Sequence, residues 1–445
     1  VSSIIMSRLK ILYTRKFGVL SVDKSDSSCS GDLTLLRKPC VLFYGAAGLD
    51  ILTFVKSFPK PDQKVRAIDQ CLEGGGNSAN SAVAASKLNI EAHLCTKLGN
   101  DQDAEVILNG LVVASVNTKN VLRSTSSKSG VTYVIVCQES GTRTCIHTAM
   151  TDEITEDELI TAFQICSFHS TGGGEGGTSS SSSRSSFSRP DSKSPLLVYD
   201  LIHLDSRHTQ AAIVLAKEAQ RQGIMVSIDF EKERPYLFDL LPYCDVIFMN
   251  RDCSGMLYPL ISDRTVRLLK VLREAWAQHC KLLVCTLGEE GSVLIATDAY
   301  LNAVNRKRPS SSHQQDIPSS FWNHTAHISE PAAVNESENG NSWSMLETDM
   351  THFGAIRTDS SKLTCPDSSK VYNVIRCSAF PLTSTQIRDS TGAGDTFIAG
   401  FIAGFLHGWA LENCMKLGTL AAAQKLQQLG SRAGQPTFSR IQALV

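Results

Sequence analysis

The stretch RDSTGAGDTFIAGFIAGFL, Arg388 to Leu406, places three small residues directly before a carboxylate, Asp395, and a run of apolar residues after it. The small residues are Gly392, Ala393 and Gly394. The apolar run contains no other charge, so it predicts a buried helix that begins at the glycines. The start of such a helix has free backbone N–H groups and the positive end of the helix dipole, and small residues let an anion come close to them.

These features predict a site for phosphate at the start of the helix, with Asp395 beside it. Asp395 could then accept the proton of an alcohol that attacks the phosphate, as a general base does. We expect the positive helix end to keep Asp395 ionised at neutral pH. The alternative is that Asp395 only caps the helix and the glycines only form its turn, and the spacing by itself does not decide between the two.

A second stretch, CLEGGGNSANSAVAASKL from Cys71 to Leu88, combines three glycines with two asparagines. Gly75 and Gly76 end an extended run. Asn77 and Asn80 are three positions apart, so they share one face of the first turn of the following helix. Two carboxamides there can donate to and accept from neighbouring hydroxyl groups, and the glycines give the chain a hinge. The alternative is that the first asparagine caps the helix and the second is solvated.

The composition indicates a protein that binds small molecules. The 445 residues include 43 Lys plus Arg and 44 Asp plus Glu, without the basic surplus that draws proteins to nucleic acids or anionic membranes. The 14 cysteines contain no C-x-x-C pair and are expected to be reduced thiols. No apolar run reaches the roughly 20 residues that span a bilayer. We expect a cytoplasmic protein whose residues 1–38 are a disordered tail or a transit peptide, the latter directing it to a plastid.

The rest of the chain, 39–445, predicts one α/β domain. Apolar strand candidates alternate with helical patterns, which is typical of a doubly wound, mainly parallel sheet with helices on both faces. Extended residues within 51–72 and the hairpin pattern of 129–149 predict a small antiparallel sheet that projects as a lid. The segments 170–194 and 302–369 have low complexity or lack a sustained period, and are predicted insertions outside the core.

Taken together, the two glycine-containing motifs resemble the PfkB/ribokinase family of small-molecule kinases. Residues 75–77 with Asn80 are similar to the first signature of that family, and residues 389–395 are similar to the second. The two motifs occur in the family's order along the chain. The resemblance extends over 41–436 outside the two insertions, and it favours the chemical interpretation of both motifs over the structural one.

The resemblance implies roles for three groups of residues. The catalytic group is a base with an anion hole of backbone amides: Asp395, with Gly392, Ala393 and Gly394. The sugar site is a set of polar side chains beside a di-glycine hinge: Asp50, Asn77 and Asn80, with Gly75 and Gly76. The nucleotide site lies at the ends of two later strands: Asn250, Thr286, Gly288 and Gly291.

The resemblance also implies ATP as phosphoryl donor together with Mg²⁺, and K⁺ activation occurs in the family. The family often has Asn-x-x-Glu, tied to magnesium and phosphate, where this chain has Asn250-Arg251-Asp252-Cys253. The glutamate is missing, so its role would pass to Asp252 or to water, and the metal ligands stay open.

Three stretches, 138–144, 202–210 and 226–235, are most similar to the ketohexokinase branch of the family. The expected reaction is therefore transfer of the γ-phosphoryl group of ATP to a hydroxymethyl group of a ketohexose-like sugar. Two alternatives stay open: a ribokinase or nucleoside kinase of the same fold, and a non-catalytic relative with a regulatory role. A homodimer through the lid is a further expectation.

Overall fold

The computed structural model of the chain describes residues 37–140, 142–165, 195–274, 277, 279–298, 300–301, 344–353, 356–364 and 370–442, with only the backbone for 344–353. Most of the predicted tail, 1–38, and the whole predicted insertion 170–194 lie outside the described residues. No helix in the described part of the chain is long and apolar enough to cross a membrane.

A central sheet of 11 strands organises the domain, in the order β13-β14-β15-β12-β11-β10-β9-β8-β1-β4-β5. The seven strands from β11 to β5 run parallel, and β12 to β13 are antiparallel. The strand bounds are Cys40–Tyr44 (β1), Glu91–Gly99 (β4), Asn117–Ser124 (β5), Leu201–Leu204 (β8), Met225–Phe230 (β9), Val246–Asn250 (β10), Leu282–Thr286 (β11), Ser292–Thr297 (β12), Ser344–Phe353 (β13), Ile356–Thr364 (β14) and Val371–Cys377 (β15).

Helices cover both faces of this sheet, as predicted, because the central strands are apolar on both sides. In β1, for example, Leu42 and Tyr44 belong to one buried cluster and Val41 and Phe43 to the other. The first cluster includes residues of Glu156–Phe163 (α4), Thr209–Gln222 (α5), Leu237–Leu240 (α6), Arg251–Leu257 (α7) and Arg264–Val271 (α8). The second includes residues of Asn77–Lys87 (α2), Gln102–Val113 (α3), Ala393–Leu406 (α10), Leu411–Leu426 (α11) and Phe438–Gln442 (α12). Three short 3-10 turns complete the described helices: Pro195–Val198, Leu241–Tyr243 and Gly288–Glu290.

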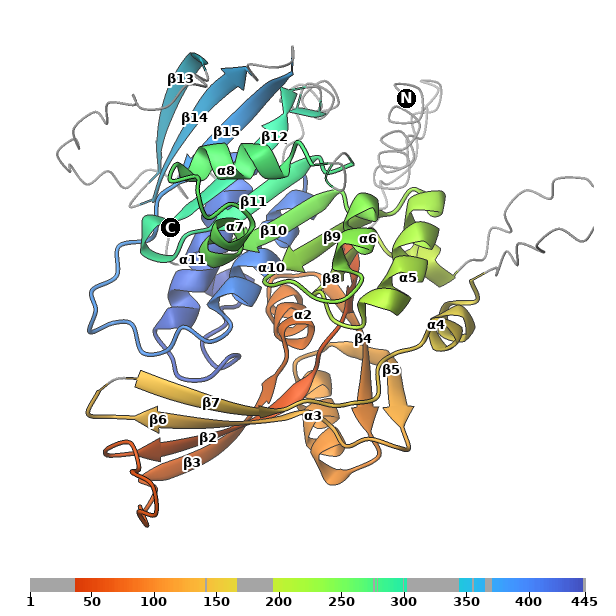
Figure 1. The fold of residues 1–445 in the computed structure, drawn as a ribbon, viewed down its shortest axis with the longest axis vertical. Coiled ribbons are helices and arrows are strands. Elements are labelled where there is room, and N and C mark those ends of the chain that lie inside the picture. The colour runs from red at the N-terminus through yellow and green to blue at the C-terminus, as the bar shows by residue number, and fades with distance from the viewer. Residues whose placement is uncertain are drawn as a thin grey trace, which may run out of the picture.

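A separate sheet of four strands projects from the main body, and Figure 1 shows it beneath the central sheet. Its order is β3-β2-β6-β7, from Asp69–Gly75, Gly48–Val55, Val131–Cys137 and Thr142–Thr148. The predicted lid is therefore confirmed, although β2 and β6 pair in parallel and make it a mixed sheet. Its outer face exposes Leu72, Tyr133 and Ile146, and the homodimer through the lid stays a prediction.

The second predicted insertion, 302–369, is wrong in its C-terminal part. Residues 356–364 form β14, which pairs with β15 in the central sheet, and β13 pairs with β14 at the edge. In β14 the buried positions include Thr358 and Ser361 as well as apolar residues, so no hydrophobic alternation is visible in the sequence. Residues 302–343 lie outside the described part of the chain.

Candidate active site

A cleft of about 600 Å³ lies between the inner face of the lid and the carboxyl ends of the parallel strands. Ligands of doubly wound sheets collect at this edge. Its walls come from the lid strands β2, β6 and β7, from the ends of β9 and β10, and from the first turns of α2 and α10. The two motifs that dominate the sequence are thus brought to one cavity.

Asp395 lies in the first turn of α10 at the wall of this cleft, and its side chain is 7 % exposed. The helix begins here because Gly392 adopts a left-handed conformation, with φ of 73°, that favours glycine. The amide Nδ2 of Asn80 donates to Oδ2 of Asp395 at 2.9 Å. This contact joins the first motif to the second across 315 positions of sequence.

The pKa of Asp395 corrects our expectation that the helix end keeps it ionised at neutral pH. Burial raises the pKa to about 7, the hydrogen bond from Asn80 opposes the rise, and the nearby charges of Glu231 and Asp205 add to it. The positive charge of Arg432 also lowers the pKa but does not offset burial. A carboxylate with a pKa near the working pH is well matched to general-base catalysis.

This pKa predicts how activity depends on pH. Because Asp395 accepts a proton only when it is ionised, kcat/KM for the acceptor should rise with pH and reach half of its plateau at about 7. The measurement is kcat/KM in buffers of constant ionic strength from about pH 5.5 to 8.5, the range around that value. A flat profile across this range would contradict the role of Asp395.

Asn80 lines the cleft, and each end of its side-chain amide already has one partner in the protein. Its Nδ2 donates to Asp395, and its Oδ1 accepts from Nε of Arg432 at 2.9 Å. Its backbone carbonyl also accepts from Nε2 of Gln435. Asn80 therefore orients the carboxylate of Asp395 as well as facing the cleft, and its use for sugar hydroxyls stays a prediction. Asn77 also lines the cleft, with its Nδ2 3.4 Å from Oε2 of Glu231.

Asp50 points from β2 into the cleft, where the prediction put it. Gly75 makes room for it: a Cβ at Gly75 would lie 2.3 Å from Oδ1 of Asp50. Gly76 has φ of 90° and packs against the carbonyl of Ala46, so the hinge requires glycine at both positions. Burial raises the pKa of Asp50, while Thr132 and Arg432 act against the rise.

The turn before α10 is held by a network around Asp389. Its Oδ1 accepts from the amide of Thr391 at 2.9 Å, and its Oδ2 accepts from the amide of Gly430 at 2.8 Å. The fully buried Lys425 donates to the backbone carbonyl of Asp389 at 2.8 Å. Burial alone would raise the pKa of Asp389, but the hydrogen bonds from Thr391 and the charges of Lys425 and Arg143 hold it below its usual value.

The predicted anion hole is brought to the cleft only in part. Gly392 and Gly394 line the cleft, but Ala393 does not, and its N–H donates to the carbonyl of Ser390 at 3.2 Å. The first N–H groups of a helix have no partner within it. The amides of Gly394 and Asp395 are therefore the better candidates for holding an anion.

The predicted nucleotide residues also divide into two groups. Asn250 and Thr286 line the cleft, at the ends of β10 and β11. Gly288 and Gly291 do not line the cleft. A Cβ at Gly291 would lie 2.0 Å from the carbonyl oxygen of Cys377, so the lack of a side chain at Gly291 allows close packing against that carbonyl. Oδ1 of Asn250 caps α7 by accepting from the amide of Cys253 at 2.8 Å.

Several charged residues of the cleft were missing from the sequence prediction. Two of them, Asp205 and Glu231, directly follow β8 and β9, and a carboxylate after a parallel strand is a usable signal for such a site. Arg143 extends from β7 to the carboxylate of Asp389 and to Oγ of Ser390, so the lid contacts the turn before α10. The others are Lys97, Asp229, His147, His208, Lys232, Arg207 and Arg234.

A family model described as the pfkB family carbohydrate kinase matches residues 39–170 and 371–438. These ranges contain Asp50, the α2 motif, the lid and the turn before α10. These two ranges are thus the two parts of a pfkB family carbohydrate kinase domain. The protein is therefore a sugar kinase, a phosphotransferase whose acceptor is an alcohol group.

Individual relatives of this pfkB kinase agree with the family assignment. Ketohexokinase of Mus musculus is 23 % identical over 271 residues, which are 59 % of this chain and 78 % of that protein. The structure of Arabidopsis thaliana ribokinase complexed with ribose and ATP has a TM-score of 0.59 at 18 % identity, covering 92 % of this chain and 98 % of the other. Ribokinase of Cryptococcus neoformans in complex with ADP has a TM-score of 0.55 at 14 % identity, covering 92 % and 100 %. Both structures share the ribokinase-like fold.

Proposed function

We propose that this pfkB kinase transfers the γ-phosphoryl group of ATP to a hydroxymethyl oxygen of a ketohexose-like sugar, with Asp395 as the general base. The observation that carries the proposal is the buried Asp395 at the start of α10, held by Asn80 in the same cleft as Asp50. A base, a helix start for phosphate and polar groups for hydroxyls thus meet in one cavity.

The proton transfer follows from the contacts of Asp395. Its Oδ2 accepts from Asn80, so Oδ1 is the oxygen that would take the proton of the sugar hydroxyl. As the proton leaves, the hydroxyl oxygen becomes the nucleophile that attacks the γ-phosphorus atom, and the bond from that atom to the oxygen bridging the β- and γ-phosphates breaks, which releases ADP. The amides of Gly394 and Asp395 would hold the phosphoryl oxygens, and Arg143 would add positive charge from the lid.

Two carboxylates of the cleft are our candidates for binding the expected Mg²⁺. Asp252, which was to replace the missing glutamate, does not line the cleft, and its side chain is 82 % exposed beside Arg251. Asp229 and Glu231 do line it, and the pKa of Asp229 is well above its usual value because of burial and the charges of Asp395 and Glu231. Such a group of oxygen donors would hold Mg²⁺, which neutralises phosphate charge in kinases.

Three relatives support the proposed donor and acceptor. The Arabidopsis ribokinase structure contains ribose and ATP, and the Cryptococcus one contains ADP, which supports ATP as the donor here. Similarity to the ketohexokinase of Mus musculus supports a ketose as acceptor. Ribose is the second candidate, because solved ribokinases share the fold across 92 % of this chain.

The experiment that tests the proposal is a coupled assay of ADP formation with fructose, other ketohexoses, ribose and adenosine. The ketohexose is expected to give the highest kcat/KM. A higher kcat/KM with ribose or adenosine would favour the second candidate or a nucleoside. Absence of ADP formation with every acceptor, from folded protein that binds ATP, would contradict the proposal.

Replacing Asp50 by asparagine should raise the KM for the sugar far more than the KM for ATP. The carboxylate is half-buried on the lid side of the cleft. Leaving such a polar group poorly matched costs about 1 to 3 kcal/mol, or roughly ten- to a hundredfold in KM. The control is Asp69→Asn on the exposed start of β3. Equal increases of both KM values would place the sugar hydroxyls elsewhere.

A further inference from the structure

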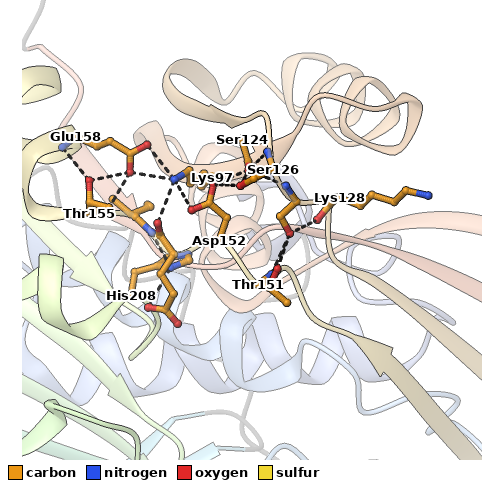
Figure 2. A network of polar contacts seen from close by, with 12 residues as sticks. Lys97, Ser124, Ser126, Lys128, Thr151, Asp152, Thr155, Glu158 and His208 are labelled. Atoms are coloured by element: carbon orange, nitrogen blue, oxygen red, sulfur yellow. Dashed lines mark hydrogen bonds and ion pairs between the residues drawn. The ribbon is translucent and has the colours of Figure 1, made fainter.

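The lid hairpin of β6 and β7 is attached to the core through two connections, 125–130 and 149–155, and one lysine holds them in place. Lys97 lies on β4 and its side chain is only 5 % exposed. Its Nζ lies 2.9 Å from Oδ1 of Asp152, 3.1 Å from the carbonyl of Glu153 and 2.9 Å from Oε1 of Glu158. Figure 2 shows these groups converging on the ammonium of Lys97.

Asp152 ties the two connections to each other. While Oδ1 faces Lys97, Oδ2 accepts from Oγ of Ser124 at 2.5 Å and from Oγ of Ser126 at 3.3 Å. One step further along, the amide of Thr151 donates to Oγ of Ser127 at 3.1 Å. The segment that enters the hairpin and the segment that leaves it are therefore joined by hydrogen bonds close to each other, several of which Figure 2 shows.

Glu158 extends the same network into the core. It is the acidic member of a capping box at the start of α4, in which Oε2 accepts from the amide of Thr155 at 2.8 Å. The amide of Ile154 also donates to Nδ1 of His208 at 3.3 Å. Lys97 thus contacts the segment between β7 and α4, and the first turn of α4, through Asp152, Glu153 and Glu158.

The ammonium of Lys97 is fully used by these contacts, although Lys97 lines the cleft. A lysine has three N–H donors, and the three partners are Asp152, Glu153 and Glu158. No donor is left for a phosphate or a sugar. Hydrogen bonds from Ser124 and Lys97 hold the pKa of Asp152 below its usual value, as expected for a carboxylate that stays ionised in this contact.

We propose that Lys97 is a positioning residue for the kinase reaction, which fixes the hinge of the β6–β7 hairpin and so places Arg143 and His147 over the cleft. Both residues lie on β7 and line the cleft. Without the ammonium, Asp152 and Glu158 would face each other as unpaired carboxylates and push the connection 149–155 away from the core. The effect on sugar binding rests on the proposed function, but the effect on the hairpin does not.

The test uses Lys97→Met, which keeps the length of the side chain and removes its charge. Lys128→Met is the matched control, because Lys128 lies on the connection 125–130 but its side chain is exposed. Amide hydrogen exchange of β6 and β7 is measured on the full chain without substrate, followed by KM and kcat for the sugar and for ATP. A mutation far from the reacting atoms that misplaces a group of the site can lower the reaction rate about a hundredfold. We therefore expect the rate of amide exchange in the hairpin and the sugar KM to rise roughly ten- to a hundredfold in Lys97→Met, and not in Lys128→Met. The change in kcat should be smaller.

A second pair of variants separates charge from packing. Asp152→Asn in the Lys97→Met background removes one of the two carboxylate charges that have lost their cation. It should therefore restore part of the protection of the hairpin against amide exchange and lower the sugar KM part of the way to the parent value. Asp152→Asn alone should loosen the hairpin if Lys97→Met does not fold. The proposal would be overturned if amide exchange in the hairpin is unchanged in Lys97→Met, even where the Tm of that variant is lower. It would also be overturned if Lys128→Met shows the same changes as Lys97→Met.

If the parent protein phosphorylates none of the sugars, the exchange result still stands by itself. Faster exchange in β6 and β7 of Lys97→Met would then support the hinge while the proposed function fails. Phosphorylation of a sugar with unchanged exchange and unchanged KM in Lys97→Met would overturn the hinge while the proposed function holds.

Discussion

Replacing Asp395 by asparagine is expected to lower kcat for the sugar by about 100- to 10,000-fold, the range typical for loss of a general base. Asparagine keeps the shape and the acceptor oxygen for Asn80, but it cannot take the proton of the hydroxyl. The affinity for ATP should change little, because the backbone amides of the turn are retained. Steady-state kinetics together with ATP binding by calorimetry would measure both effects.

The stability of this variant gives a built-in control. The pKa of Asp395 is raised to about 7 in the folded protein, so its stabilising contribution is largest at acidic pH and is lost as the pH rises to about 7. Asparagine removes the buried charge, so Tm at alkaline pH should not fall. Asp252→Asn, an exposed carboxylate outside the cleft, should leave kcat unchanged. A folded Asp395→Asn protein within a few-fold of the parent rate would make Asp395 a helix cap only.

Replacing Arg432 by methionine should have the second largest effect, on both stability and pH dependence. Nε of Arg432 donates to Oδ1 of Asn80 and Nη2 donates to the carbonyl of Gly75, each at 2.9 Å. Burial lowers the pKa of Arg432 to about 10, and the nearby charges of Asp50, Glu73 and Asp395 oppose that fall. The guanidinium is thus a cation close to three carboxylates, two of which, Asp50 and Asp395, line the cleft.

Without Arg432 these carboxylates keep their burial but lose their cation. Breaking a buried charge cluster typically costs about 3 to 5 kcal/mol, so the free energy of unfolding should fall by that amount. The pKa of Asp395 should rise further, which would move the rise of kcat/KM to higher pH. Urea unfolding and the pH profile measure these effects, with Arg440→Met on the exposed face of α12 as control. An unshifted profile in a folded Arg432→Met protein would remove Arg432 from the electrostatics of the base.

The sequence was sufficient for those parts of the fold and site that depend on local pattern. The alternation of apolar strands and helices predicted the doubly wound sheet, and the hairpin pattern of 129–149 predicted the lid. Gly392 and Asp395 lie where the helix start was predicted, because a left-handed glycine before an apolar run is a local signal.

The features that could not be predicted depend on contacts between distant parts of the chain. Asn80 was expected to bind sugar, and its contacts with Arg432 and Asp395, which are 352 and 315 positions away, were not expected. The pKa of Asp395 was expected to follow the helix dipole, but burial has the larger effect, and burial is not visible in a short motif. Strand β14 was missed because serine and threonine occupy some of its inner positions.

The central claim, that this cleft moves phosphate from ATP to a sugar hydroxymethyl group through Asp395, is tested most directly by identifying the product. The parent protein and Asp395→Asn are incubated with ATP, Mg²⁺ and fructose, and the products are followed by phosphorus NMR with correlation to the sugar protons. The parent is expected to form ADP and a sugar phosphate ester on a hydroxymethyl carbon, whereas Asp395→Asn should form neither above background over the same time. Equal amounts of ester from both proteins, or a parent that binds ATP and fructose yet forms no ester, would contradict it.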